Sequence, residues 1–250
     1  MIKKNILLEL KVNGFTILKN FFKKKDINDL LKAYEDNINY CCSISMPPKN
    51  IKNKSLNEKY LFLKKKNNIL KSRSYDLSKY DPSIYKFSTN YKLEKILKSY
   101  FNEKYFIDLP QIRIDDSSNS YMLPLHQEIY GQISSNLLTM WAPLTKVSKK
   151  NGTLAVIKGS HNNGLLKHQY YKINKNKYHG VKKDLLKGKK ITYLNLLPGD
   201  IVLFHPLLVH GTGKNYTNKI RWTFVARYNG ISGVEYLNNN KHPLRIEQQV

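Results

Sequence analysis

The spacing of apolar residues changes near residue 105, and this change limits the folds open to the chain most strongly. Between residues 27 and 38, and again between 91 and 101, apolar residues recur at the spacing of one helix face. After that point come at least seven short β-rich runs, separated by Gly, Asn, Pro or Lys-rich breaks. A helical front followed by these strands predicts a mainly β (α+β) fold, a sandwich or double-sheet jelly roll with helices packed on one side.

The 250 residues are interpreted as one folding unit. We expect a helix-rich N-terminal support over 1–104, a jelly-roll core over 105–230 and a C-terminal tail over 231–250. Within the support, residues 43–75 are polar and predict loops with short elements. Residues 162–190 are Lys-rich and weakly patterned, which predicts a long insertion near one end of the sandwich, placed as a lid would be.

The charge of the chain is strongly positive, with 43 basic against 18 acidic residues and a net charge of +25. Such a charge attracts nucleic acid or an anionic membrane surface. The lysines, however, are spread from end to end among abundant Asn, Ile and Tyr, a pattern typical of A/T-rich codon usage, and only five residues are Arg. We therefore expect the lysines to form a solvated surface that binds no specific nucleic acid. The substrate is expected to be a small molecule, and the positive charge is compatible with an anionic one. Each arginine is notable in a chain whose default cation is lysine.

Nothing in the sequence predicts export or a membrane span. The first apolar stretch is short and is interrupted by Glu9 and Lys11, and no apolar run approaches the roughly 18 residues that cross a bilayer. The two cysteines, Cys41 and Cys42, are adjacent and cannot form a disulfide framework or a cysteine-based zinc site. These features favour a cytoplasmic protein, and they leave the oligomeric state undetermined.

Two residues in a strand-like segment have the chemistry of metal ligands. His126 and Glu128 are separated by one residue, so in an extended chain both side chains lie on the same face. A third ligand must come from another strand, and His210 ends an apolar run just before a Gly-rich turn. Two histidines and one carboxylate on one side of a metal form the arrangement used by non-haem Fe(II) oxygenases.

Eleven residues beyond His210, Arg221 occupies a predicted core strand with Thr223 on the same face. An unpaired guanidinium there would be costly, so an anion should meet it. A dicarboxylate such as 2-oxoglutarate would satisfy this need, with Thr223 donating a hydroxyl. An internal salt bridge to Asp or Glu explains the spacing equally well.

Taken together, several segments resemble the phytanoyl-CoA dioxygenase family of Fe(II)/2-oxoglutarate-dependent oxygenases, whose core is a double-stranded β-helix of jelly-roll or cupin-like form. Residues 13–38 are similar to the family's opening strand and helix, and L-P-L-H-Q-E is similar to its H-Q-D metal motif. Residues 140–161 resemble its W-x-P-L and P-G-S-H block. Residues 197–213, followed by Arg221, resemble its distal histidine and cosubstrate arginine.

The resemblance implies a set of site residues. The metal ligands for Fe(II) would be His126, Glu128 and His210. The residues around the cosubstrate 2-oxoglutarate would be Arg221, Thr223, Gln111 and Trp141. Tyr130, Gln132 and His161 are candidates for contact with the primary substrate, and O2 is the second cosubstrate.

One departure from the family pattern concerns the carboxylate ligand. The family's aspartate is Glu128 here, and the extra methylene moves the carboxylate by about 1.5 Å, the length of one C–C bond. A carboxylate still binds iron, and its presence argues against the related halogenases, which replace it by a small residue. A second departure, Lys158 in place of proline, concerns a turn.

The expected function is therefore an Fe(II)- and 2-oxoglutarate-dependent dioxygenase that hydroxylates a small molecule and releases succinate and CO2. The alternative is a non-catalytic cupin-like binding protein with a degenerate metal site. A basic nucleic-acid-binding protein is a third reading.

Overall fold

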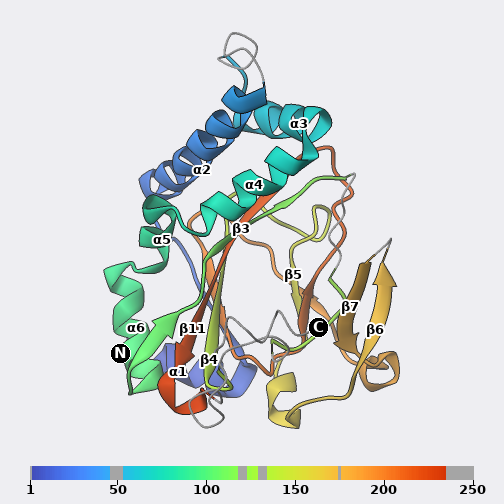
Figure 1. Cartoon of the computed structure of the whole chain (residues 1–250). Helices are drawn as coiled ribbons and strands as arrows, with labels where there is room; N and C mark the ends of the chain where they lie inside the picture. Colours follow the sequence, from blue (N-terminus) through green and yellow to red (C-terminus); the bar gives the residue numbers. More distant parts are fainter. Residues whose placement is uncertain (1, 46–52, 118–122, 129–133, 174–175, 235–250) are drawn as a thin grey trace.

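Apart from strand β1, the α-helices precede the strands along the chain in the computed structural model, which describes residues 2–45, 53–117, 123–128, 134–173 and 176–234 (Figure 1). The helices are α1 (Ile2–Asn13), α2 (Lys24–Ser45), α3 (Leu56–Lys66), α4 (Asn68–Ser78), α5 (Pro82–Ser88) and α6 (Tyr91–Phe101). The strands are β1 (Phe15–Leu18), β2 (Tyr105–Ile107), β3 (Gln111–Asp115), β4 (Leu137–Pro143), β5 (Leu154–Val156), β6 (His168–Ile173), β7 (Asn176–Val181), β8 (Thr192–Tyr193), β9 (Ile201–Phe204), β10 (His210–Thr212) and β11 (Arg221–Gly230).

The major sheet is centred on β11 and has the order β1-β9-β4-β11-β2, with β3 also paired to β11. Both faces of β11 are buried. Because side chains alternate along a strand, Trp222, Phe224 and Tyr228 pack among the helices, whereas Val225 packs inside the barrel. Arg221, Thr223 and Arg227 have the same parity as Val225, so the strand directs them into the barrel interior.

A smaller sheet, with the order β10-β5-β8, faces the major sheet. Buried residues of both sheets form one apolar cluster between them, including Trp141, Leu154, Val202 and Phe204. Burial of these side chains from the two inner faces holds the sheets together, as in other double-sheet folds. This is the arrangement of two facing antiparallel sheets that the sequence predicts.

The segment 43–75 departs from its expected loop structure, because it contains α3 and most of α4. Ser55 forms a capping box at the start of α3, in which its backbone N–H donates to the Glu58 carboxylate at 2.8 Å. Asn67 caps α4 by accepting the Leu70 N–H at 3.0 Å. Local capping and the burial of Tyr60 and Leu63 stabilise helices whose polar composition hides their periodicity. Figure 1 shows α4 lying across β3.

Within the expected insertion, residues 168–173 and 176–181 pair as the antiparallel strands of the β6–β7 hairpin, which lies beside the smaller sheet in Figure 1. The backbone N–H of Val181 donates to the Leu125 carbonyl at 2.7 Å, which ties the hairpin to the segment just before His126. The hairpin is therefore bonded to the same segment that carries His126 and Glu128, the first predicted metal ligands. Closure of this segment over a ligand stays a prediction.

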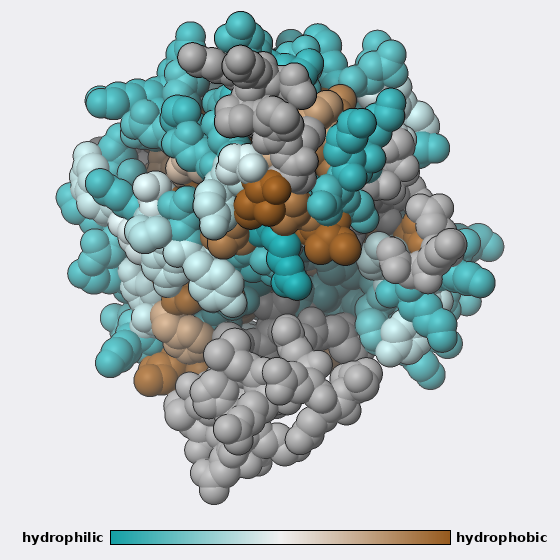
Figure 2. Space-filling view, turned by 45° about the horizontal axis from the view of Figure 1, so that its top comes forward, coloured by the Kyte–Doolittle hydropathy of each residue, from teal (hydrophilic) through white to brown (hydrophobic). Residues whose placement is uncertain are grey.

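The surface turned toward the reader in Figure 2 is mostly hydrophilic, with small groups of hydrophobic side chains. Among the described residues, no helix is both long and apolar enough to cross a membrane.

Candidate metal centre

His126 and His210 lie directly opposite each other, although 84 positions separate them in the chain. They form an antiparallel bridge in which the N–H of His126 donates to the His210 carbonyl at 2.8 Å and the reverse bond measures 3.0 Å. The N–H of Glu128 donates to the Pro206 carbonyl at 2.8 Å, which extends the pairing. Backbone pairing thus brings His210 to the face that carries His126 and Glu128.

The protonation of the two imidazoles is set by backbone carbonyls. Nδ1 of His126 lies 2.8 Å from the Pro124 carbonyl oxygen, and Nδ1 of His210 lies 2.9 Å from that of Leu208. A carbonyl can only accept, so both Nδ1 atoms donate a proton, and in the neutral form of the ring Nε2 keeps a lone pair. Burial, followed by the nearby His126, lowers the pKa of His210 and favours this neutral form.

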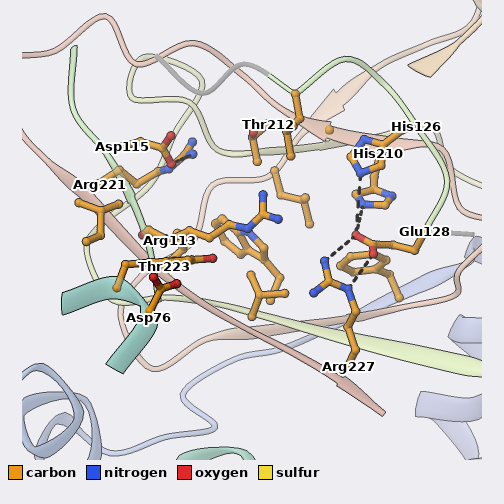
Figure 3. Close-up of a pocket in the computed structure, with 18 of the residues that line it drawn as sticks. Asp76, Arg113, Asp115, His126, Glu128, His210, Thr212, Arg221, Thr223 and Arg227 are labelled. Atoms are coloured by element: carbon orange, nitrogen blue, oxygen red, sulfur yellow. Dashed lines mark hydrogen bonds and ion pairs between the residues drawn. The ribbon is translucent and has the colours of Figure 1, made fainter. Parts of the chain in front are cut away.

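The three potential ligand atoms converge on one point (Figure 3). Oε1 of Glu128 lies 3.3 Å from His210 Nε2 and 3.8 Å from His126 Nε2, and all three atoms lie within 4.8 Å of one another. A hydrogen bond joins His210 Nε2 to Glu128 Oε1, and a cation that displaces its proton would find all three atoms as ligands. Two imidazole nitrogens and one carboxylate on one side fit a divalent transition metal such as Fe(II).

Arg227 holds the Glu128 carboxylate from the other side. Its Nε donates to Oε2 at 2.8 Å and its Nη2 to Oε1 at 3.4 Å, and both side chains are buried. Burial alone would raise the pKa of Glu128, but Arg227 and the two histidines outweigh it, and the pKa lies well below its ordinary value. The forked contact orients a carboxylate that is one methylene longer than the family's aspartate.

Arg221 forms a buried ion pair with Asp115, its neighbour across the β11–β3 ladder. This contact occupies Nη2, whereas Nε and Nη1 are buried and have no hydrogen-bond partner among the described residues. Gly152 leaves room beside this guanidinium, because a Cβ there would approach Nη1 to 2.7 Å. The internal salt bridge is therefore present, and binding of a further anion by the two remaining donors of Arg221 stays a prediction.

One cavity of about 290 Å³ connects the histidines to Arg221. Its wall includes six of the residues proposed from the sequence, namely His126, Glu128, Trp141, His210, Arg221 and Thr223. The hydroxyl of Thr223 lies 3.4 Å from the Arg113 carbonyl oxygen. His126, His210 and Glu128 lie at one end of the cavity and Arg221 with Asp115 at the other, and Trp141, Leu154 and Val225 add apolar side chains to its wall.

The remaining sequence-predicted residues lie elsewhere. Gln111 is on β3 opposite Val225 and is not among the residues that line the cavity, and its contact with the cosubstrate stays a prediction. Tyr130 and Gln132 lie outside the described residues. His161 also lies away from the cavity wall: its Nε2 is 2.9 Å from the Lys11 carbonyl oxygen, so its ring contacts α1.

His205 packs against His161, with ring centroids 5.3 Å apart, and its Nδ1 accepts the Leu207 N–H at 3.1 Å. Burial, with His161 adding to it, lowers its pKa from 6.5 to about 4. As the pH falls, the His205 imidazole is therefore protonated in the unfolded chain before it is protonated in the folded protein. We expect the free energy of unfolding to fall as pH drops from 6.5 to about 4. For one proton the slope is at most about 1.4 kcal/mol per pH unit.

Urea unfolding across this pH range tests the expectation. His205→Asn keeps an acceptor near the Leu207 N–H but does not titrate, so its stability should depend less steeply on pH. An identical pH dependence in the two proteins would assign the slope to other groups.

Sequence reasoning missed Arg113, Asp115 and Arg227, which also line the cavity. The scarcity of arginine was a signal that could have found two of them, because three of the five arginines in the chain, Arg113, Arg221 and Arg227, lie in this wall. Asp115 had no comparable signal. It also missed Lys71, Tyr75 and Asp76, which reach the cavity from α4, a helix that begins within the segment expected to be loop.

The fold matches solved non-haem oxygenase structures. The structure of EctD from S. alaskensis with 2-oxoglutarate and 5-hydroxyectoine superimposes with a TM-score of 0.64 at 17% sequence identity, covering 91% of this chain and 76% of that one. This similarity confirms the predicted cupin-like fold with its antiparallel sheets and helices.

Comparison with known sequences gives the family. A curated protein from Caenorhabditis elegans, named probable phytanoyl-CoA dioxygenase, is 32% identical over 122 residues, which are 46% of this chain and 38% of that protein. Human peroxisomal phytanoyl-CoA dioxygenase is 34% identical over 114 residues, 43% of this chain and 33% of that protein. The aligned part thus spans little more than a third of these relatives. Because the sequence model of the family matches residues 10–223, the chain belongs to the phytanoyl-CoA dioxygenase (PhyH) family.

Proposed function

We propose that this chain is a dioxygenase that uses Fe(II) and 2-oxoglutarate to hydroxylate a small molecule, with succinate and CO2 as coproducts. The observation that carries the proposal is the convergence of three lone-pair donors from His126, Glu128 and His210 at one end of a cavity. The same cavity ends at the two unpartnered nitrogens of Arg221. Family membership and the EctD structure that holds 2-oxoglutarate support it.

In this proposal the protein's residues divide the work. His126, Glu128 and His210 hold the metal, and the carbonyls of Pro124 and Leu208 hold the imidazoles in the tautomer that a metal needs. Activation of O2 and oxidation of a C–H bond are the chemistry that bound iron supplies.

The cosubstrate is assigned to the other end of the cavity. Arg221 would hold the distal carboxylate of 2-oxoglutarate through an unpartnered nitrogen, Nε or Nη1, and Thr223 would contribute its hydroxyl. Trp141 and Val225 form an apolar wall between the two ends, which excludes water from the space where oxidation occurs.

Binding of the two ligands should stabilise the folded protein. At one hundred times the dissociation constant, a ligand that binds only the folded state adds about 2.7 kcal/mol to the free energy of unfolding. We expect Fe(II) with 2-oxoglutarate, added anaerobically to the metal-free protein, to raise its melting temperature and to produce a metal-to-ligand absorption band. The cosubstrate without metal serves as the control. A folded, metal-free protein that shows neither effect would favour the non-catalytic binding protein.

A further inference from the structure

Arg113 projects from β3 into the middle of the cavity, between Arg221 and the metal centre (Figure 3). Its strand pairs it with Thr223 of β11, so both side chains lie on the inner face of the sheet. Within the part of the chain that the structure describes, the Arg113 guanidinium makes no hydrogen bond and no ion pair with a side chain. Arg113 also lines an adjoining cavity of about 230 Å³, whose wall includes Tyr178 and His179 of the hairpin.

The carboxylates in the described wall of the main cavity are all engaged by other cations. Asp115 pairs with Arg221, and Glu128 pairs with Arg227. Asp76 pairs with Lys79, which lies outside the cavity, at 3.1 Å. Arg113 therefore has no carboxylate of its own to neutralise it.

A second uncompensated cation, Lys71, lines the same cavity from α4. Burial and then the nearby Lys64 lower the pKa of Lys71. Lys64 is itself paired with Asp116 at 2.8 Å, so this carboxylate is shared. The cavity thus contains two half-buried cations, from β3 and from α4, whose charges the described wall does not balance.

The proposed metal and cosubstrate do not balance them either. Fe(II) brings two positive charges and 2-oxoglutarate brings two negative charges, so the loaded centre adds no net charge to the cavity. A half-buried guanidinium with five donors and no acceptor remains to be satisfied by something else that enters. A carboxylate or a phosphate matches its forked geometry.

From these observations, and on the basis of the proposed function, we propose that Arg113, assisted by Lys71, binds an anionic group of the primary substrate. The substrate class is then a small molecule that carries a carboxylate or a phosphate. Arg113 holds this group midway along the cavity, and the apolar part of the molecule lies against the Trp141 and Val225 wall.

Calorimetric titration of simple probes tests the proposal. Hexanoate, hexyl phosphate and the neutral hexanamide are titrated anaerobically into the full chain loaded with Fe(II) and 2-oxoglutarate. We expect at least one anion to bind about tenfold more tightly than hexanamide, since hydrogen bonds to a charged group contribute roughly 1.5–3 kcal/mol. Hexanoate and hexyl phosphate distinguish a carboxylate from a phosphate substrate.

Variants assign the preference to a residue. Arg113→Gln should abolish it, Arg113→Lys should retain part of it, and Lys71→Met should weaken it less than Arg113→Gln does. Arg73→Gln is the matched control, because Arg73 is an exposed arginine of α4 outside the cavity wall and its loss changes the net charge equally. This control should keep the full preference.

Three results would overturn the proposal. The first is a wild-type protein that shows no preference for either anion, including one that binds neither. The second is an unchanged preference in Arg113→Gln. The third is an Arg113→Gln protein whose half-saturation by 2-oxoglutarate rises about tenfold while its preference persists, which would assign Arg113 to the cosubstrate.

Failure of the proposed function would look different. In that case the wild-type protein would not bind Fe(II) and 2-oxoglutarate, and the absorption band would be missing. The same three titrations on the metal-free protein then test the anion site independently of the proposed function. A preference for an anion that depends on Arg113 supports the site, and the lack of such a preference overturns it.

Discussion

Glu128→Ala should lose most of its affinity for iron and, at the same time, destabilise the metal-free protein. Iron affinity falls because one of three ligands is gone. Stability falls because Arg227, which is buried and donates to both Glu128 oxygens, is left without its partner. Breaking a buried ion pair from one side costs about 3–5 kcal/mol. Iron titration and urea unfolding of the apo protein measure the two losses separately.

Two further variants separate the ligand role of Glu128 from its ion pair. The double variant Glu128→Ala with Arg227→Met should recover much of the lost stability but none of the iron affinity, since both buried charges are removed. Glu128→Asp should keep weak iron binding, because the carboxylate survives at a shorter reach. Unchanged iron affinity in Glu128→Ala would remove the metal centre, and with it the proposed enzyme.

Arg221→Lys should raise the half-saturation concentration of 2-oxoglutarate by about tenfold or more, while iron binding alone stays nearly unchanged. Lysine keeps the positive charge beside Asp115 but loses the separate Nε–H and Nη1–H donors, which are the unpartnered nitrogens of Arg221 among the described residues. Anaerobic titration with 2-oxoglutarate, followed by the absorption band, gives its half-saturation concentration. A metal titration without 2-oxoglutarate gives the dissociation constant of iron.

The matched control is Arg73→Lys, which makes the same change at an exposed site on α4 and should leave both constants as they are. An Arg221→Lys protein that loses iron and cosubstrate together, or that unfolds, would mean that Arg221 serves only as the structural partner of Asp115. Asp115→Asn then checks this structural role, because it weakens the ion pair between Asp115 and Arg221 without changing Arg221 itself.

The part of the site that could be predicted lies within short stretches of chain. His126 and Glu128 are two positions apart in an extended segment, and Arg221 and Thr223 share one face of a strand, so strand geometry alone assigns their direction. The prediction of loops over residues 43–75 was wrong. Helices α3 and α4 form there because caps and packing stabilise them, although their composition is polar. That error concealed the helix that brings Lys71 to the cavity.

The sequence by itself determined the change from a helical front to a β-rich core, the family, and the residues whose chemistry suits a metal and a dicarboxylate, because these depend on residue type and on spacing over a few positions. Only the tertiary structure decided which distant residues meet. The bridge between His126 and His210, the Arg227–Glu128 contact 99 positions apart, and the place of Arg113 all depend on strand register. Register is a property of the whole sheet: it follows from burying one face of every strand at once, so no local segment contains it.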